Sequence, residues 1–433
     1  MNRLNQLAQQ ILSEAKAQGA DYAQCSVSES EKKEFNVDGG RFSLMRTLYN
    51  RNVVITVLKN QCKGTVQINR FDEEAVQSAV SDAMAAAESG KPDPAWEFAK
   101  VPVEKDITDG TPECETDKLF ERSRELLETI RAKHPKILME QMITEHNCGS
   151  RVFMSTNDVI YRVRSGAYSF GLMYSAHEGE KSTSFYGTDV TLKNLDKPVI
   201  DCGLIEWELS RVEEQLEPRT LEGKFTGPVL LAPGALAEIV LWTLLGKFVS
   251  DACLIDGTSI WKDKLGEQVA DPSFTLSFEP YHEDVVVRDP CTGEGYPTEN
   301  FDLIRNGRLM SFALSQYGAN KTGGKRAGNG GSNMRVEAGK QSLEEIISGI
   351  DKGVLVMRFS GGDPAASGEF SGVAKNSFLI ENGKIACALS ETMISGCIPE
   401  MLKQIRAISS ETLKDGNVSL PYIAFDGLTI SGK

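Results

Sequence analysis

The segment that most constrains the fold is a long apolar stretch at the start of the second half of the chain. Residues 227–232 are predicted to form a buried strand, and Pro233 and Gly234 make a turn that opens a helix over residues 235–250. This helix is apolar on nearly all of its faces, which is typical of a helix that other elements surround. We therefore expect it to lie in the core of the second half.

Strands punctuated by glycine dominate the residues that follow. Asn306-Gly307 and Asn382-Gly383 each separate two β-rich runs, and this dipeptide is a strong signal for a tight hairpin. Two further helices are expected, over residues 343–349 and near residues 399–408. The second half is thus the more β-rich part of the chain.

The first half mixes helices and strands. Asp38-Gly39-Gly40 marks a hairpin turn, and Asp72 stands where a side chain would cap a helix. Residues 90–113 are polar, rich in proline and without helical period, so we expect an ordered connection or an exposed excursion there. Helices are predicted over residues 1–16, 72–89, 116–132 and 203–215, a hairpin over residues 35–42, and strands over residues 23–30, 52–58, 64–69, 137–144, 151–154, 159–174 and 182–189.

These patterns predict an α+β fold of two domains. We expect residues 1–220 to form an N-terminal α/β domain with a mixed sheet. Residues 221–433 are expected to form a C-terminal β-rich domain with long antiparallel strands and a buried helix. Each domain would be large enough to bury a core of its own.

Charge and hydropathy exclude several classes of partner. The net charge is -14, from 61 acidic and 47 basic residues, and no block of lysine and arginine interrupts it, so direct binding to nucleic acid or an anionic membrane is not expected. The longest apolar run, residues 239–245, is far shorter than the roughly 20 residues of a membrane helix. The N-terminus lacks the apolar core of a signal peptide, and the nine cysteines form no C-x-x-C pair. We therefore expect a cytoplasmic protein with free thiols.

The residues needed for familiar hydrolytic chemistry are missing or scattered. Zinc hydrolases commonly place two histidines within one helical turn or so, whereas the closest pair here, His134 and His146, is twelve residues apart. No G-x-S-x-G elbow occurs. His282, Glu283 and Asp284 are adjacent, but neighbours in a strand point to opposite faces and would need a bend to converge.

Two glycine-rich regions are candidates for a substrate groove. They comprise Gly328, Asn329 and Gly330 in a longer glycine-dense loop, and Gly361 and Gly362. Glycine allows another backbone to approach closely, which would suit a peptide lying along a strand edge. Plain turns would produce the same residues, and no helix follows the first loop as a phosphate cradle requires.

A set of short motifs in the second half occurs in the order found in one known family. The set comprises Leu231-Ala232-Pro233-Gly234-Ala235, Pro297-Thr298, Leu303-Ile304-Arg305-Asn306-Gly307, Gly328-Asn329-Gly330, Ala338-Gly339-Lys340, Gly361-Gly362, Ser367-Gly368-Glu369-Phe370, residues 378–385, and Gly396 before an expected helix over residues 402–408. Together these motifs resemble the TldD/PmbA family, some of whose members are named as proposed modulators of DNA gyrase. The resemblance covers most of residues 227–433, and the first half agrees in outline.

The resemblance implies a cytoplasmic metalloprotease system. Family members have an N-terminal α/β domain and a C-terminal β-rich domain, work as paired subunits around an enclosed cavity, and cut unfolded or peptide-like substrates. One branch carries an H-E-x-x-x-H helix and a late cysteine that together hold zinc. The PmbA or TldE branch lacks these ligands and acts as the partner subunit.

This chain departs from the zinc-bearing pattern. Leu241, Trp242 and Gly246 stand at the positions that the resemblance assigns to histidine, glutamate and histidine, and the late cysteine falls near Thr412. We therefore expect no catalytic residue and no metal in this subunit, with zinc held by a paralogous partner. We also expect core residues to have refilled the site.

The prediction is a non-catalytic subunit of a TldD/PmbA-type protease that acts on unfolded or peptide substrates. It would dimerise with a zinc-bearing paralogue or with itself. Two alternatives stay open. One is a stand-alone hydrolase that uses other residues, for example His282 with Glu283 or Asp284. The other is a peptide-binding or regulatory protein, such as a modulator of DNA gyrase, that cleaves nothing.

Overall fold

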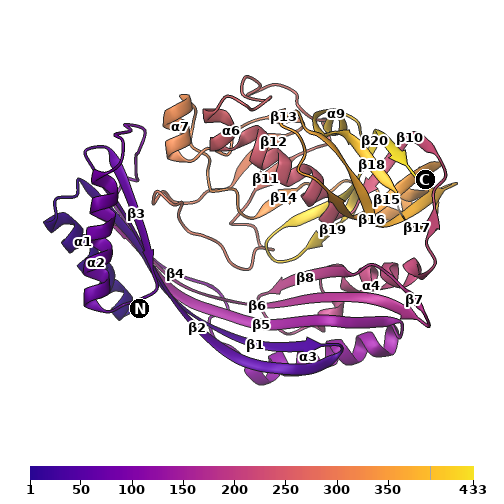
Figure 1. Ribbon diagram of the computed structural model, residues 1–433, viewed down its shortest axis with the longest axis horizontal. Helices are drawn as coiled ribbons and strands as arrows, with labels where there is room; N and C mark the ends of the chain where they lie inside the picture. Colours follow the sequence, from indigo (N-terminus) through magenta and orange to yellow (C-terminus); the bar gives the residue numbers. More distant parts are fainter. Residues whose placement is uncertain (391) are drawn as a thin grey trace.

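The computed structural model describes residues 1–390 and 392–433 and has the expected α+β architecture. Figure 1 shows the long, curved strands of the N-terminal half lying beneath the C-terminal half. The elements of the N-terminal half are α1 (Asn2–Ala17), β1 (Tyr22–Asp38), β2 (Arg41–Lys59), β3 (Cys62–Ile68), α2 (Glu73–Glu88), β4 (Val103–Gly110), α3 (Thr116–Lys133), β5 (Ile137–Ser155), β6 (Val159–Glu178), β7 (Lys181–Ser182), β8 (Tyr186–Leu192), η1 (Val199–Asp201), α4 (Ile205–Glu213) and η2 (Glu214–Leu216).

The N-terminal sheet is mixed, as predicted. Its order is β3-β2-β1-β5-β6-β4, with β7 and β8 also paired to β6. β4 runs parallel to β6, whereas β1, β2, β3 and β5 form antiparallel pairs. The sequence pattern missed β4 and broke β1 and β5 into shorter strands, because polar residues occupy the middle of each.

Local signals set the ends of several of these elements. Gly39 and Gly40 adopt φ of 54° and 73° in the two-residue turn between β1 and β2, which confirms the predicted hairpin. Asp72 caps α2, since its Oδ1 accepts a hydrogen bond from the Ala75 amide at 3.1 Å. Helix α3 begins at Thr116, where the helix was predicted to start, and the side chain of the preceding Glu115 makes no cap bond.

The C-terminal half is β-rich, as predicted. The order of strands in its sheet is β13-β12-β11-β14-β20-β10-β15-β16-β17-β9, and β18 and β19 pair alongside. Its elements are β9 (Arg219–Thr220), β10 (Lys224–Leu231), α5 (Pro233–Leu236), η3 (Ala237–Leu241), η4 (Leu244–Val249), α6 (Asp251–Ile255), β11 (Leu276–Phe278), β12 (Phe301–Arg305), β13 (Arg308–Leu309), α7 (Gln316–Thr322), β14 (Met334–Val336), α8 (Leu343–Ser348), β15 (Lys352–Gly361), β16 (Glu369–Glu381), β17 (Lys384–Ser390), β18 (Met393–Cys397), α9 (Ile398–Lys403), β19 (Ile405–Lys414) and β20 (Ser419–Ser431). The last strand of the first sheet ends at Leu192 and β9 begins at Arg219. The domain boundary at residues 220 and 221 stays a prediction.

Both Asn-Gly hairpins of the C-terminal half are present, β12–β13 and β16–β17. Helix α8 begins with a capping box in which Ser342 and Glu345 bond each other's backbone amides. Three helices differ from the prediction. α9 ends at Lys403 and the chain then enters β19, so a helix through residue 408 was wrong, and α6 and α7 were not predicted.

The apolar core is partly shared between the two halves. One cluster lies between α1, α2 and the first strands, and another surrounds the helical residues 233–249. A third combines side chains of α3, α4, β6 and β8 with side chains of β15, β16 and β20. Each half therefore has an apolar cluster of its own, and the third cluster joins the two halves.

A loop over residues 286–299 ties the C-terminal half to the N-terminal sheet. Gln24 donates a hydrogen bond to the Gly293 carbonyl at 2.8 Å, and the Ala99 amide donates to the Glu294 carbonyl at 2.9 Å. Cys291 packs against Phe153 and its neighbours on the sheet. Among the described residues, no helix is both long and apolar enough to cross a membrane.

Candidate functional site

The helix at the predicted zinc positions is an irregular one. It starts with Pro233 at its first turn, and residues 237–241 and 244–249 form π-helical turns. π-helical turns are rare and often mark functional sites. This segment is therefore the natural place to look for a site.

The side chains at the predicted zinc positions lie on different faces of this helix. Leu241 is fully buried in the C-terminal core, but Trp242 is 58% exposed. Gly246 is exposed too, and a Cβ added there would meet nothing within 4 Å. The expectation that core residues refill these positions was thus right for Leu241 and wrong for Trp242 and Gly246.

Glu238 lies one turn before Trp242, on the same exposed side of the helix. Its Oε2 accepts a hydrogen bond from the Phe359 amide at 3.3 Å. Partial burial raises the pKa of this carboxyl, while the Phe359 amide and the positive charge of Arg358 act in the opposite direction. The exposed face therefore carries an acid, an indole and a bare stretch of backbone.

Arg358 links this face to the N-terminal half. Its guanidinium donates a hydrogen bond to the Ser184 hydroxyl at 3.1 Å and stacks over the Phe185 ring at 4.5 Å from the ring centre. Phe185 is itself half exposed. Arg358 thus joins the segment around Phe185 to the exposed face of the helix, a contact between distant segments that no local pattern in the sequence predicts.

The donor set at the predicted zinc positions does not fit a zinc ion. Leucine, tryptophan and glycine carry no imidazole, carboxylate or thiolate, and Thr412, half buried on β19 opposite Pro421, offers only a hydroxyl. Among residues 1–390 and 392–433, no group of three or more His, Cys, Asp or Glu side chains is placed to hold a metal ion. No chemical step through a metal is derived for this chain.

His282 is brought together with charged neighbours. Its Nδ1 lies 3.4 Å from Asp284 Oδ2, and its Nε2 lies 2.8 Å from a guanidinium nitrogen of Arg335. Asp284 also pairs with Lys414 at 2.9 Å. Because arginine can only donate, it occupies the Nε2 lone pair that a general base would need. Glu283 makes no ion pair in the described structure, so this cluster is poorly arranged for hydrolysis.

The other three histidines each have structural partners of their own. His134, buried at the end of α3, bonds Glu213 at 2.9 Å, so it is a capping and not a solvated residue. His146 Nε2 bonds the Thr111 carbonyl at 2.7 Å, and burial lowers its pKa. His177 bonds the Ser175 hydroxyl at 2.9 Å.

The first glycine segment lines a cavity of about 790 Å³ at the end of the C-terminal half. Gly328 contributes to its wall together with apolar and cationic side chains, and the volume lies in the range of small-molecule sites. Asn329 is buried, and its amide is used internally, donating to the Glu299 carbonyl at 3.0 Å and accepting from the Gly331 amide at 2.8 Å. Gly330 faces open space.

The second glycine segment lies elsewhere. Gly361 is the last residue of β15 and faces Gly372 of β16, while Gly362 lies in open space beyond the strand. In the described structure, neither residue lines the cavity beside Gly328, and the two segments share no hydrogen bond. The structure thus separates the two predicted parts of the substrate groove.

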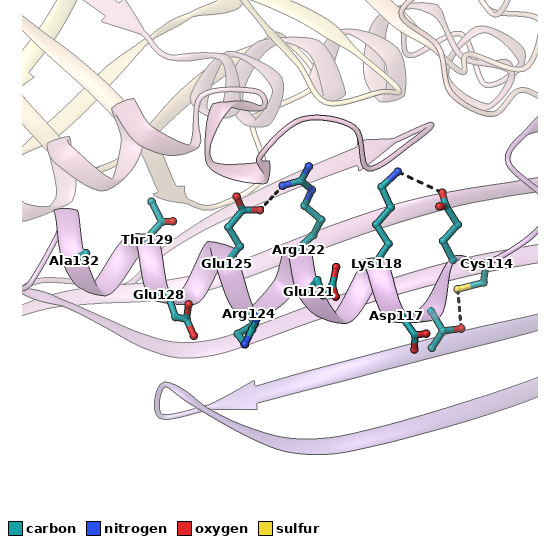
Figure 2. Close-up of a pocket in the computed structure, with 12 residues that line it drawn as sticks. Cys114, Asp117, Lys118, Glu121, Arg122, Arg124, Glu125, Glu128, Thr129 and Ala132 are labelled. Atoms are coloured by element: carbon teal, nitrogen blue, oxygen red, sulfur yellow. Dashed lines mark hydrogen bonds and ion pairs between the residues drawn. The ribbon is translucent and has the colours of Figure 1, made fainter.

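A hollow of about 1410 Å³ runs along α3 (Figure 2). Figure 2 shows Arg122 paired with Glu125, and Lys118 turned to an acidic neighbour, while Asp117, Arg124 and Glu128 point to the opposite side of the helix. These side chains are charged and largely exposed, which is typical of a solvated helix face. We assign no site to this hollow.

All nine cysteines are free thiols, and burial raises the pKa of Cys291 to about 12.

The comparisons with known proteins define the class to which the fold and helix belong. Residues 223–432 match the family model of the PmbA/TldA metallopeptidase C-terminal domain. This part of the chain is therefore a PmbA/TldD-family domain, and the resemblance predicted from the ordered motifs is confirmed.

Particular relatives extend the match over the whole chain. The chain is similar to the metalloprotease PmbA of Escherichia coli, with 26% identity, covering 94% of this chain and 88% of that protein. It is 24% identical to the metalloprotease PmbA homolog of Haemophilus influenzae, with the same coverage. The fold is that of TldE from Thermococcus kodakarensis, with a TM-score of 0.87 at 22% identity over 98% of this chain and 100% of that one. A Thermotoga maritima protein named as a proposed modulator of a DNA gyrase gives a TM-score of 0.83 at 20% identity over 99% of this chain and 100% of that one.

Proposed function

We propose that this chain is a non-catalytic subunit of a PmbA/TldD-type protease and works with a zinc-bearing paralogue. The observation that carries the proposal is the set of side chains on the π-helical segment and β19. Leu241, Trp242, Gly246 and Thr412 offer no zinc ligand, while Trp242 and Gly246 face outward. A subunit of this kind would contribute surface and not a metal.

The exposed face of the helix suits contact with an extended peptide or with the partner subunit. Trp242 offers a large, rigid apolar surface, of the kind enriched at binding hot spots. Gly246 leaves the helix backbone open beside it, and Glu238 provides an acceptor on the same face. The substrates we propose are unfolded proteins or peptides, because the relatives are named metalloproteases. The proposed location is the cytoplasm.

Hydrolysis of reduced, unfolded casein tests this proposal. We would compare this chain alone, a zinc-bearing paralogue from the same cell alone, and the two together, each with and without a chelator. The expected result is cleavage that needs the paralogue, increases when this chain is added, and stops on chelation. Cleavage by this chain alone that survives chelation would refute the proposal.

Two variants separate the alternatives. His282→Ala should leave the activity of the mixture unchanged, because Arg335 already occupies Nε2 of this histidine. Trp242→Ala should weaken the increase in cleavage that this chain causes when it is added to the paralogue. The fold of the variant, followed by circular dichroism, should stay that of the parent. If the chain binds peptide or paralogue without any cleavage in the mixture, the regulatory or peptide-binding alternative replaces the protease subunit.

A further inference from the structure

Strand β2 leaves a long edge of the N-terminal sheet unpaired. β1 pairs with β2 from Arg41 to Leu58, but β3 covers only its far end, from Val53 to Lys59. In the described part of the chain, no strand bonds the outer edge of residues 41–52. Figure 1 shows this part of β2 along the lower rim of the molecule. An uncovered edge of this length is a template for a further strand.

The register identifies which backbone groups face outward. Lys59 and Cys62 flank a two-residue turn formed by Asn60 and Gln61, with φ of 50° and 65°, so these flanking residues exchange both ladder bonds across β2 and β3. Backbone groups alternate along a strand, and the pairing of β2 with β1 is regular between Leu44 and Leu58. Odd-numbered residues therefore direct their N–H and C=O groups away from β1, and Met45, Thr47, Tyr49 and Arg51 present them at the free edge.

The side chains of the same stretch are unusually apolar for an exposed edge. Phe42 is 37% exposed, Leu44 45%, Met45 62% and Tyr49 75%. These residues occupy both faces of the strand. Phe42 contacts Phe120 of α3 on one face, and a bulge between Phe42 and Leu44 turns Leu44 to the other face. A strand laid along the edge could therefore cover apolar surface on both of its faces.

The charges along β2 select the partner. The strand carries Arg41, Arg46, Arg51 and Lys59 and no acidic residue, in a chain with a net charge of -14. Arg46 pairs with Glu34 of β1 at 2.8 Å. Arg41 and Arg51 lie opposite Asp38 and Glu29 of β1 in the register but form no ion pair in the described structure. On the outer side of β2, acidic side chains opposite these arginines would be attractive and basic ones repulsive.

A second copy of this edge is a poor fit. An antiparallel two-fold pairing centred on residues 45–47 would place Arg46 opposite or diagonal to its own copy, and like charges at such positions are destabilising. The arginines therefore discourage self-pairing, which is how natural sheets commonly protect their edges. They do not discourage a strand of opposite charge.

A hollow beside the edge gives the partner side chains a place to lie. Its volume is about 750 Å³, and its wall includes Tyr49 and Arg51 of β2 and Arg164 of β6, together with Glu29 and Glu31 of β1. Arg164 forms no ion pair in the part of the chain that the structure describes. The hollow thus carries both signs of charge, and its two arginines are available to acidic side chains of a partner.

We propose that the outer edge of β2, from Arg41 to Arg51, binds an extended, acid-rich segment of another protein by adding it to the N-terminal sheet. Backbone bonds from the odd-numbered residues would supply affinity, and the arginines would supply selectivity. This interaction is independent of the proposed protease role, because it uses neither the π-helical segment nor the glycine cavity.

The test uses two fluorescein-labelled peptides of ten residues, one alternating glutamate with valine and the other alternating lysine with valine. Fluorescence anisotropy with the full chain should show binding of the glutamate peptide, with the lysine peptide about tenfold weaker or more. The double variant Arg41→Glu, Arg51→Glu should reverse this preference. Because the chain carries a net charge of -14, a gain of binding to the lysine peptide supports the proposal when the circular dichroism of the double variant matches that of the parent, and no gain in such a folded variant contradicts it.

A second pair of variants tests the backbone bonds. Thr47→Pro removes an N–H that faces the free edge and should abolish binding, whereas Thr47→Val keeps the N–H and should bind like the parent. Equal binding of both peptides, or displacement of the glutamate peptide by oligothymidine, would overturn the proposal in favour of a nonspecific charged surface. A concentration-dependent dimer that Thr47→Pro dissolves would overturn it in favour of a second copy.

Discussion

Glu208 on α4 is an acidic residue held between the two halves of the molecule. Its carboxylate accepts hydrogen bonds from the hydroxyls of Thr188 at 2.6 Å and Tyr186 at 3.1 Å. Burial raises its pKa from 4.5 to about 7, although both hydroxyls act to lower it. The folded protein therefore binds an extra proton between these two pH values. The contribution of Glu208 to the free energy of unfolding is fully present below pH 4.5. It is lost as the pH rises through 7, and the loss amounts to roughly 3 kcal/mol.

Glu208→Gln should remove this pH dependence, because glutamine keeps the shape and carries no proton to lose. Urea unfolding at a series of pH values between 4 and 8.5, a range chosen to bracket the two pKa values, measures the slope. Glu222→Gln, an exposed residue with no ion pair in the described structure, is the control and should keep the slope of the parent. An unchanged slope in Glu208→Gln would show that another group is responsible.

Asn329 shows how a residue can be singled out for the wrong reason. We predicted it as part of a groove, but its amide holds the Glu299 carbonyl and the Gly331 amide inside the loop. Asn329→Ala should lower the free energy of unfolding by roughly 1–3 kcal/mol, because buried polar groups lose their partners. Gly330→Ala, which enters open space, should change it little. Thermal unfolding of the two variants side by side makes the comparison, and equal losses would contradict this assignment.

At the scale of elements, the π-helical segment places neighbouring residues in opposite environments. Leu241→Ala should cost about 2–5 kcal/mol in unfolding free energy, because it opens a cavity in the C-terminal core. Trp242→Ala should cost less than about 1 kcal/mol, since the indole is mostly in solvent. Chemical denaturation of both variants tests this contrast. A large loss for Trp242→Ala would mean that its ring supports the fold after all.

Many turns, caps and strands of the fold could be predicted from local sequence patterns, and the predictions that failed have physical causes. The turns at Gly39-Gly40 and Asn382-Gly383 and the cap at Asp72 were correct, because each depends on a few adjacent residues. The exposure of Trp242 was missed because π-helical turns shift the faces that a regular helical period assigns. Likewise β4 was missed because its residues are polar and are ordered by pairing with β6, far along the chain.

The candidate site was predictable only in its chemistry. The identities of Leu241 and Trp242 exclude zinc ligation by those side chains wherever they lie. Their surroundings depend on contacts between distant segments, such as Arg358 with Phe185. The glycine segments were predicted together, yet the structure separates them, because no pairing signal in the sequence relates residues 328–330 to residues 361–362.

At the scale of the whole molecule, the shared core should make the two halves unfold together. Tyr168 and Phe170 of β6 belong to the same cluster as Phe378 and Tyr422 of the C-terminal sheet. Separating the halves would expose this cluster, whose apolar burial contributes about 25 cal/mol for each Å². Helix α7 adds a second link, with Tyr317 stacked on Trp96 at 3.9 Å between ring centres and bonded to Asp93 at 2.9 Å.

Denaturant unfolding of the intact chain should therefore give one transition, with the same midpoint by tryptophan fluorescence and by far-ultraviolet circular dichroism. The fragments 1–220 and 221–433, produced separately, should bind a hydrophobic dye more strongly than the intact chain, because each exposes its share of the common cluster. Two separated transitions, or fragments that are as stable as the intact chain and bind no dye, would mean that the shared cluster couples the halves only weakly.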